Sequence, residues 1–265
     1  MTGGHFITGV EYNRFGKYSF IRRNRKMAKY KRVLLKFSGE ALAGDKKQGF
    51  DEATCISVAE QVKKIVDEGV QVAVVIGGGN FWRGRDSETI DRFKADQIGM
   101  LATVMNCVYV SEIFRFVGMK TSIYTPYTFG DISELFTKDR AVSDLEAGKV
   151  ILLAGGTGHP YFSTDTATAL RAVELNCDII LMAKNFTGEG IEGVYSADPA
   201  KVPSAIKYDT ISLEEVFAKK LKVIDTSATV VCMENKMPLL IFKLNRPNGI
   251  YDNATGTCTG TIVTA

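Results

Sequence analysis

The most constraining feature of the sequence is VAVVIGGGNFWRG at residues 72–84, a short apolar run that ends in three consecutive glycines. Five apolar residues without polar alternation are typical of a strand that is buried on both faces, as in a parallel sheet. The glycines at 77–79 permit a sharp turn and let a ligand approach backbone N–H groups. Asn80 adds a polar side chain, and Arg83 and Arg85 add guanidinium groups. The segment predicts an anion site at the carboxyl end of a strand, and a tight turn that binds nothing is the alternative.

Composition places the chain among ordinary globular proteins. Of its 265 residues, 45% are apolar and 24% are charged, and no apolar run approaches the roughly 18 residues of a membrane span. The length suits two small domains or one large α/β domain. Five scattered cysteines without a CxxC pair predict reduced thiols in a cytosolic protein. With only His5 and His159 available, a histidine-rich metal site is almost excluded.

The positive charge of the chain is concentrated at its N-terminus. Residues 1–26 carry six basic side chains and one acidic side chain, which leaves 27 basic and 29 acidic residues in the remainder. That remainder has no overall signature of nucleic-acid binding. We expect residues 1–26 to be a disordered extension, with Met27 as an alternative start, and residues 27–265 to form one domain. The extension lacks the apolar core of a signal peptide, and a weak contact with RNA or a membrane surface is the alternative.

A second strand end carries a lysine. Residues 32–37, RVLLKF, predict a buried strand, and Lys36 stands near its end, shortly before Ser38 and Gly39. A lysine in this position either extends to water or is aimed at a bound anion. Because a glycine-rich strand end follows in the chain, we favour contact with a phosphate. A polar loop, GDKKQG, follows at residues 44–49.

Helical periodicity separates the strands of the first half. Asp51 is a predicted N-cap for a helix that ends near Glu68, so the first third is a β-α-β unit. A long, partly buried helix is predicted from Asp96, because apolar residues from Ile98 to Val108 recur at helical spacing. Asp96 either complements the dipole of this helix or accepts hydrogen bonds from ribose hydroxyls.

The second half repeats the pattern of a strand followed by glycines. Residues 150–154, VILLA, lead into GGTGHPYFSTDT, and Thr164 or Asp165 is the predicted cap of the next helix. Backbone N–H groups, hydroxyls and a helix N-terminus together form a ready phosphate site, although a purely structural capped turn could use the same residues. Further strands are predicted at residues 121–124, 178–183, 238–244 and 260–262, and helices at 132–146, 209–220 and 225–235.

Two nucleotide-binding fingerprints are rejected. Gly188, Gly190 and Gly193 satisfy G-x-G-x-x-G, but they lead into the turn sequence VYSADP instead of opening a helix after the first strand of a βαβ unit. The sequence G-x-x-x-x-G-K-[ST] does not occur, which excludes a P-loop.

Seven segments of the chain resemble one known family when they are taken in order. They are KFSGEAL, VVIGGGNFWRG, DQIGMLATVMN, AGGTGHPYFSTDT, GVYSADPAK, LKVIDTSA and the closing GTIV. They are similar to the bacterial-type UMP kinases (uridylate kinases) of the amino-acid kinase superfamily, over about residues 30–265. The resemblance implies an α/β fold, a three-layer α/β/α sandwich around a mostly parallel central sheet. It also implies transfer of the γ-phosphoryl group of Mg-ATP to UMP by a cytoplasmic homohexamer.

The resemblance also implies roles for individual residues, and no metal ligands are assigned. Lys36, Arg83 and Asp165 would act at the reacting phosphates, with helix capping as the alternative for Asp165. Lys184, at a strand end, is a hypothesis for a further cation, with a solvent-directed lysine as the alternative. The ATP side would use Lys36, Phe37, Ser38, Gly39, Gly79, Arg83, Asn185, Tyr195 and Asp198. The UMP side would use Gly78, Asp96, Thr157, Gly158, His159, Pro160, Tyr161, Phe162, Ser163 and Thr164.

Two further segments bear on this resemblance. The effector loop of the family would fall at residues 44–49. The segment between Asn185 and Tyr195 is longer than the N-x-V-D-G-V-Y turn of the family. The resemblance is therefore weakest for the contacts to adenine or ribose, and for Asn185 above all. Asp178 and Asp225 occupy further acidic positions, where capping is an equal explanation.

The proposed chemistry fits this set of residues. A phosphate acceptor is already ionised, so the site must align two polyanions and neutralise their charge rather than supply a base. Three alternatives remain: a sister kinase that acts on an amino acid or carbamate, a nucleotide-binding regulator without turnover, and an RNA-binding protein. A sister kinase would lack Asp96 and the TGHPYFST loop, and intact Lys36 and Arg83 argue against the regulator. The slightly acidic body argues against RNA binding.

Overall fold

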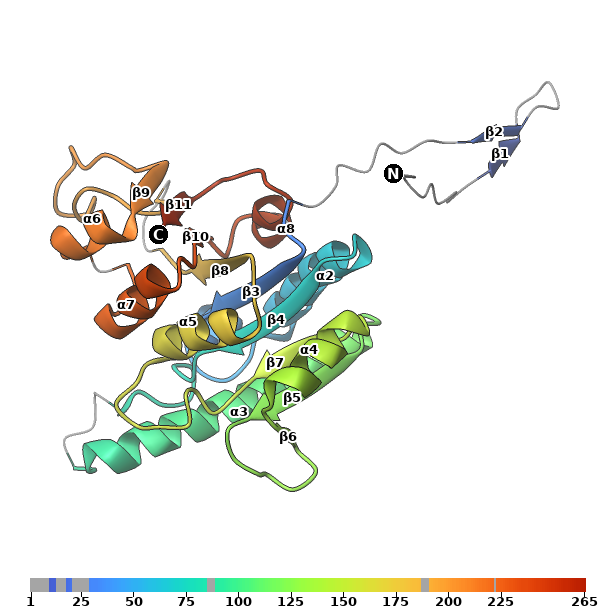
Figure 1. Cartoon of the computed structure of the whole chain (residues 1–265), viewed down its shortest axis with the longest axis horizontal. Coiled ribbons are helices and arrows are strands. Elements are labelled where there is room, and N and C mark those ends of the chain that lie inside the picture. The colour runs from blue at the N-terminus through green and yellow to red at the C-terminus, as the bar shows by residue number, and fades with distance from the viewer. Residues whose placement is uncertain (1–9, 13–17, 21–28, 85–88, 187–190, 222) are drawn as a thin grey trace.

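The computed structural model describes residues 10–12, 18–20, 29–84, 89–186, 191–221 and 223–265, and it centres on a nine-stranded sheet (Figure 1). The strands of this sheet are β3 Arg32–Phe37, β4 Gln71–Ile76, β5 Thr121–Thr125, β6 Glu134–Leu135, β7 Val150–Leu153, β8 Ile179–Lys184, β9 Thr210–Ser212, β10 Leu239–Lys243 and β11 Thr261–Thr264. They lie in the order β6-β5-β7-β4-β3-β8-β10-β11-β9. Every neighbouring pair is parallel except β10 with β11. The predicted α/β fold with a mostly parallel sheet is confirmed.

Helices cover both faces of the sheet, so the molecule has three layers. Apolar residues of α2, α3 and α8 share one core with the odd-numbered residues of β3, and those of α4, α5, α6 and α7 share the other core with Leu34. Both faces of the central strands are therefore buried, which explains their unbroken apolar sequences. The helices are α1 Gly39–Leu42, α2 Glu52–Asp67, α3 Arg92–Phe116, α4 Lys138–Glu146, α5 Thr164–Glu174, α6 Leu213–Ala218, α7 Thr226–Glu234 and α8 Gly249–Ala254, with a 3₁₀ turn at Gly44–Lys46.

Near the N-terminus, β1 Val10–Tyr12 and β2 Tyr18–Phe20 form a separate antiparallel pair. The other residues of 1–28 lie outside the described part of the chain. The expectations of a disordered extension over residues 1–26 and of a single domain over 27–265 therefore stay predictions.

Most predicted strands and helices are confirmed where the apolar pattern is strong. Asp51 caps α2 as predicted, because its side chain accepts a hydrogen bond from the backbone N–H of Thr54 at 2.9 Å. The predicted helix at 132–146 is wrong at its start, since β6 forms first and the helix begins at Lys138. The predicted helix at 209–220 is likewise split into β9 and the shorter α6. α8 was not predicted.

The long helix α3 differs from the prediction in its start and in its buried face. It begins at Arg92 rather than Asp96, because Asp91 caps it by accepting a hydrogen bond from the N–H of Phe93 at 3.1 Å. The residues that pack against the sheet and α2 include Val104, Cys107, Val110 and Phe114. Most of the apolar stripe on which the helix was predicted faces outward: Ile98, Leu101, Met105 and Val108 are exposed.

α3 would also pass for a membrane span by its length and composition alone. Its inner face, however, is packed into the core together with α2 and the sheet, as in the core helix of a globular fold. Its outer face leaves an apolar surface that the described chain does not cover.

Candidate active site

The candidate site lies where the central parallel strands end. β3 ends beside β4 and β8, with Lys36 in register with Val75 and Met182. Lys184 is the last residue of β8 and lies in register with Lys243 of β10. Because carboxyl ends of parallel strands meet at one edge of a sheet, the topology brings Lys36, Lys184 and both glycine-rich loops to the same edge.

A cluster of charged side chains occupies this edge. Lys36 Nζ lies 2.7 Å from Asp165 Oδ1, and both side chains are largely buried. Burial alone would raise the pKa of Asp165, but the charges of Lys36 and Lys184 and the hydrogen bond from Lys36 outweigh it, so the net pKa is lowered. Asp165 is therefore an anion at neutral pH that holds two cations, and it is a poor base.

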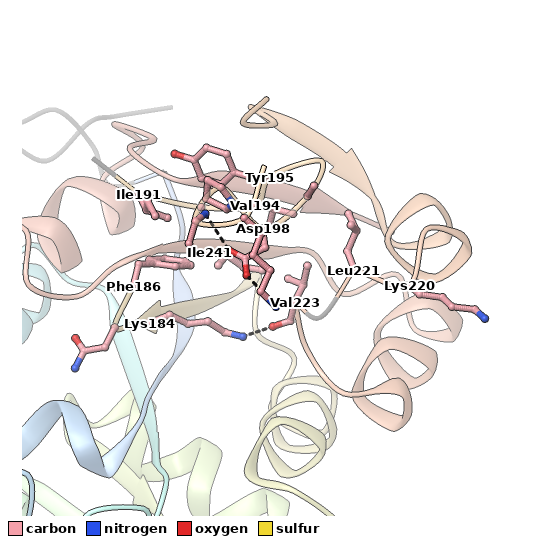
Figure 2. A pocket seen from close by; sticks show the side chains of 16 residues that line it. Lys184, Phe186, Ile191, Val194, Tyr195, Asp198, Lys220, Leu221, Val223 and Ile241 are labelled. Carbon is pink, nitrogen blue, oxygen red and sulfur yellow. Dashed lines mark hydrogen bonds and ion pairs between the residues drawn. The ribbon is translucent and has the colours of Figure 1, made fainter. Parts of the chain in front are cut away.

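Lys184 is held at the same cluster from the other side. Its Nζ donates a hydrogen bond to the backbone carbonyl of Val223, and its side chain points into the space between β8 and the segment before α7 (Figure 2). Burial lowers the pKa of Lys184; Asp165 and Asp225 partly oppose this effect, while Lys36 adds to it. The hypothesis that Lys184 is a further cation of the site gains support, because its side chain is not a surface lysine extended into water.

Helix α5, which carries Asp165, is held at its N-terminus by hydrogen bonds to Asp225. Ser163, not Thr164 or Asp165, is the N-cap of α5, and its hydroxyl accepts a hydrogen bond from the N–H of Asp165 at 3.0 Å. The Ser163 hydroxyl in turn donates to Asp225, which also accepts a hydrogen bond from Thr166 at 3.0 Å. Asp225 caps α7 through the N–H of Ala228, so the N-termini of α5 and α7 lie side by side (Figure 1).

The loop after β4 approaches α3 and α1 closely. A Cβ atom at Gly78 would lie 2.8 Å from the carbonyl oxygen of Gly99, so only glycine fits there. Arg83 forms an ion pair with Glu40 at 2.6 Å, and that carboxylate lies against Gly79. The predicted guanidinium is therefore at this mouth, held by an acid of α1. Arg85 lies outside the described residues.

One expectation about this loop is wrong. Asn80 was predicted to offer its side-chain amide to a ligand, but Asn80 is only 1% exposed and its amide faces the protein interior. It binds Gly49 and Asn106 instead. The sequence could not show this, because an asparagine after glycines looks the same whether it faces solvent or core.

The loop after β7 faces the start of α3. Asp96 accepts hydrogen bonds from the N–H of Tyr161 at 2.8 Å and from Arg92 at 2.9 Å, which ties the loop to the helix. Thr157 turns the loop by bonding to His159 at 3.2 Å. Exposed rings stand at the loop tip, on Tyr161 and Phe162. The structure thus brings together the residues predicted for the UMP side; Gly158 and Pro160 are buried within the loop, and Ser163 and Thr164 open α5.

A cavity of about 620 Å³ opens beside the charged cluster. Its walls include Lys184, Asn185, Tyr195 and Asp198, so three residues predicted for the far end of ATP line one space together with the strand-end lysine (Figure 2). Phe37 ends the neighbouring strand β3, Ser38 and Gly39 lead from it into α1, and Gly79 and Arg83 lie in the loop after β4. The walls also include apolar side chains that the sequence analysis missed: Phe186, Ile191, Val194, Leu221, Val223 and Ile241.

The arrangement can bind a large anion that has an apolar part. A cavity of this size with mixed walls is typical of small-molecule sites. The cluster of Lys36, Asp165 and Lys184 at its end supplies positive charge, and the N-terminus of α5 adds its dipole. Residues 187–190, which belong to the longer segment noted before Tyr195, and with them Gly188 and Gly190, lie outside the described residues.

Known proteins share both the sequence and the fold. Residues 31–243 match the Amino acid kinase family. The "Uridylate kinase" of Limosilactobacillus reuteri (strain DSM 20016) is 45% identical over 237 residues, which cover 89% of this chain and 97% of that protein. Two solved structures cover 89% of this chain at 33% identity: UMP kinase from Bacillus anthracis, with a TM-score of 0.84 and 96% of its chain, and UMP kinase from Ureaplasma parvum, with 0.83 and 99%. This chain therefore belongs to the uridylate kinases of the amino acid kinase family, and it is an enzyme.

Proposed function

We propose that the enzyme transfers the γ-phosphoryl group of Mg-ATP to UMP and releases ADP and UDP. The observation that carries the proposal is the cluster of Lys36, Asp165 and Lys184, which connects the cavity beside β8 to the loop after β7. Asp165 directly follows that loop, and Lys184 lines the cavity. The names of the relatives, uridylate kinase and UMP kinase, supply the two substrates.

In this proposal, ATP binds in the cavity with its phosphates toward the strand ends. Asn185, Tyr195 and Asp198 line the part of the cavity suited to the base and ribose. The phosphates would contact the groups at the ends of β3 and β4, namely Lys36, Phe37, Ser38, Gly39, Gly79 and Arg83. Arg83 would exchange Glu40 for a phosphate, since a guanidinium binds either anion through the same donors.

In this proposal, UMP binds between the start of α3 and the loop after β7. Asp96 is the group proposed for the ribose hydroxyls, because its carboxylate lies at the mouth of the loop and already accepts a backbone N–H. The phosphate of UMP would lie at Gly78 and the N-terminus of α5, near Ser163 and Thr164. The remaining contacts of this side are proposed for Thr157, Gly158, His159, Pro160, Tyr161 and Phe162.

The reaction needs alignment and charge neutralisation more than proton transfer. An oxygen of the UMP phosphate forms a bond to the γ-phosphorus while the bond from that phosphorus to the bridging oxygen breaks, and ADP leaves. Because the attacking phosphate is already ionised, no base is required.

Lys36, Arg83 and Lys184 would neutralise the charge shared by the two nucleotides, and Asp165 would hold the two lysines in place.

The described residues fit a magnesium ion that is held mainly by ATP. Among them, no group of three or more His, Cys, Asp or Glu side chains could form a metal cage. Mg²⁺ bound to nucleotide phosphates needs only one or two protein carboxylates, and Asp165 is the carboxylate of the cluster. When bound with ATP, the ion supplies further neutralisation of phosphate charge.

We further propose a cytoplasmic homohexamer in which the outer face of α3 is one interface between copies. The exposed apolar side chains of that face support it: Phe93, Ile98, Leu101, Met105, Val108 and Phe116. Buried, reduced thiols at Cys55, Cys107, Cys177 and Cys232 fit a cytoplasmic protein.

The test is a coupled assay of ADP release with Mg-ATP and, in turn, UMP, CMP, dUMP and carbamate. We expect turnover with UMP and little with the other acceptors. Preference for carbamate would retain the fold and overturn the acceptor site. Folded protein that binds UMP but turns over no acceptor would favour the second candidate, a nucleotide-binding regulator.

A further inference from the structure

Two buried asparagines face each other beneath the glycine loop that follows β4. Asn80 belongs to that loop and Asn106 to the middle of α3, and they are 1% and 0% exposed. Asn80 Nδ2 donates to Asn106 Oδ1 at 2.9 Å, and Asn106 Nδ2 donates back to Asn80 Oδ1 at 2.8 Å. The two amides therefore form a closed, reciprocal pair inside the protein.

The remaining donors of this pair bind two backbone carbonyls. Asn106 Nδ2 donates to the carbonyl of Gly77 at 2.7 Å, and Asn80 Nδ2 donates to the carbonyl of Gly49 at 2.9 Å. An amide has two N–H donors, so all four donors of the pair are used. Exchanging the oxygen and nitrogen of either amide would place acceptors against each other, so the two amides have one orientation, in which each donates to one of the two carbonyls.

A third segment packs directly on the pair. A Cβ atom at Gly39 would lie 2.1 Å from Asn80 Oδ1, 2.4 Å from the carbonyl oxygen of Gly77 and 2.8 Å from Asn106 Nδ2. The start of α1, the glycine loop and the end of the loop at residues 44–49 thus meet at the two amides. Burying two amides is costly unless they are bonded, and an apolar pair would fill the space without holding either carbonyl.

We propose that Asn106, together with Asn80, is a positioning residue for phosphoryl transfer. The pair fixes the Gly77 carbonyl, and with it the two peptide groups of Gly78 and Gly79 that follow, against Gly39. Because both side chains are buried, the role is one of support, without contact to a substrate. This inference rests on the proposed function, in which Gly39, Gly78 and Gly79 contact the two nucleotides, and adds a rigid support that acts through the backbone.

The test uses the full chain with Asn106→Leu, Asn106→Asp and Asn80→Ala, and Asn253→Ala as the matched control. Asn253 is also 0% exposed and bonds Gly249 and Thr259 in the α8 region, and neither partner belongs to α1, the glycine loop or α3. We expect the Asn106 variants to lose about 10²-fold in kcat, because small displacements of aligned groups cost that much. Asn253→Ala should lose thermal stability and keep the kinetic constants of the wild type.

A second readout does not depend on turnover. Trp82 is the single tryptophan of the chain, stands in the same loop, and bonds the carbonyl of Ala95 at 2.8 Å. Loss of the pair should increase quenching of Trp82 fluorescence by acrylamide in the Asn106 and Asn80 variants, and leave it unchanged in Asn253→Ala. Since an Asn106→Leu chain can fail to fold, the same-size Asn106→Asp and the truncation Asn80→Ala keep the test decisive.

The outcomes separate this inference from the proposed function. Wild-type kcat and quenching in a folded Asn106 variant, with active wild-type enzyme, would overturn the positioning role. Absence of turnover in the wild type with every acceptor would instead overturn the proposed function, and the quenching experiment would still decide whether the pair holds the loop.

Discussion

At the scale of single residues, Lys36 is the cation with the clearest geometry. Its Nζ contacts Asp165 at 2.7 Å in a largely buried cluster. Lys36→Ala should lower kcat by about 10²- to 10³-fold, as the loss of one buried donor to a developing charge does in other enzymes. The coupled assay with UMP measures this loss.

The matched control is Lys63→Ala, which removes a lysine from a partly exposed pair with Asp67 on α2. It should leave turnover unchanged. A Lys36→Ala enzyme with the kcat of the wild type would remove Lys36 from the catalytic set.

Lys184 predicts opposite effects of pH on activity and stability. Burial lowers its pKa, so it should lose its proton, and kcat should fall, at a lower pH than for an exposed lysine. In the same window the unfolded chain binds more protons than the native one, so the free energy of unfolding should rise with pH. Rate profiles and melting temperatures of the wild type and Lys184→Met would show this pair of trends. An activity that stays level throughout that window would contradict a role for the Lys184 charge.

The sequence predicted where the charged residues of the candidate site would meet better than it predicted the walls of the cavity. Lys36 and Lys184 stand at ends of apolar strands, where the parallel topology makes their meeting foreseeable. Val223 could not be foreseen, because it contributes a backbone carbonyl rather than a side chain. Asn80 was misjudged because its partner Asn106 is supplied by a helix that no local pattern places beneath it.

At the scale of elements, α3 also supports the second glycine loop. The Thr103 hydroxyl accepts a hydrogen bond from the N–H of Gly155 at 2.8 Å and donates to the carbonyl of Met100 at 2.6 Å. Thr103→Val leaves that buried N–H without its partner, which costs about 1 kcal/mol or more. We expect KM for UMP to rise by about fivefold and KM for ATP to change less.

Ser111→Ala is the control for this variant. Ser111 is a buried hydroxyl on the same helix, but it bonds Thr121 at the start of β5, at the other end of that strand from the site. It should lower stability without changing either KM. Equal changes in both variants would mean that Thr103 contributes only to the stability of the fold.

The elements were predictable where one pattern dominated. Unbroken apolar runs gave the central strands, and the Asp51 cap gave α2. The start of α3 was missed because its cap, Asp91, precedes Ile98, the first residue of the apolar stripe, by about two turns. α8 has no side-chain cap, since Asn248 enters it with a φ of 56°, and such a start leaves little signal in the sequence.

At the scale of the whole molecule, the outer face of α3 should hold copies of the chain together. Leu101 and Met105 are half exposed on this face. The double change Leu101→Glu with Met105→Glu would bury charges in a contact between copies, and should reduce the particle to smaller species in light scattering. Ile206→Glu, which alters an even more exposed apolar residue elsewhere, should leave the particle mass unchanged. An unchanged mass in the double variant would assign the interface to another face.

The N-terminal segment should be dispensable for catalysis. Every residue placed in the site lies beyond residue 30, and the segment 1–26 carries the excess of positive charge. A chain that begins at Met27 should keep kcat and both KM values in the coupled assay. A fall in turnover with retained folding would show that the segment contributes to the site.

β3 is the first strand of the large sheet to leave the ribosome, yet it ends up at the centre of that sheet, between β4 and β8. β4 follows soon, but the other neighbour is complete only when residue 184 has been synthesised. Until then one edge of β3 has no strand of its own sheet to pair with, and an unpaired apolar edge is a template for another chain. The risk of pairing with another chain is therefore greatest during translation, before β8 has been synthesised and has paired with β3.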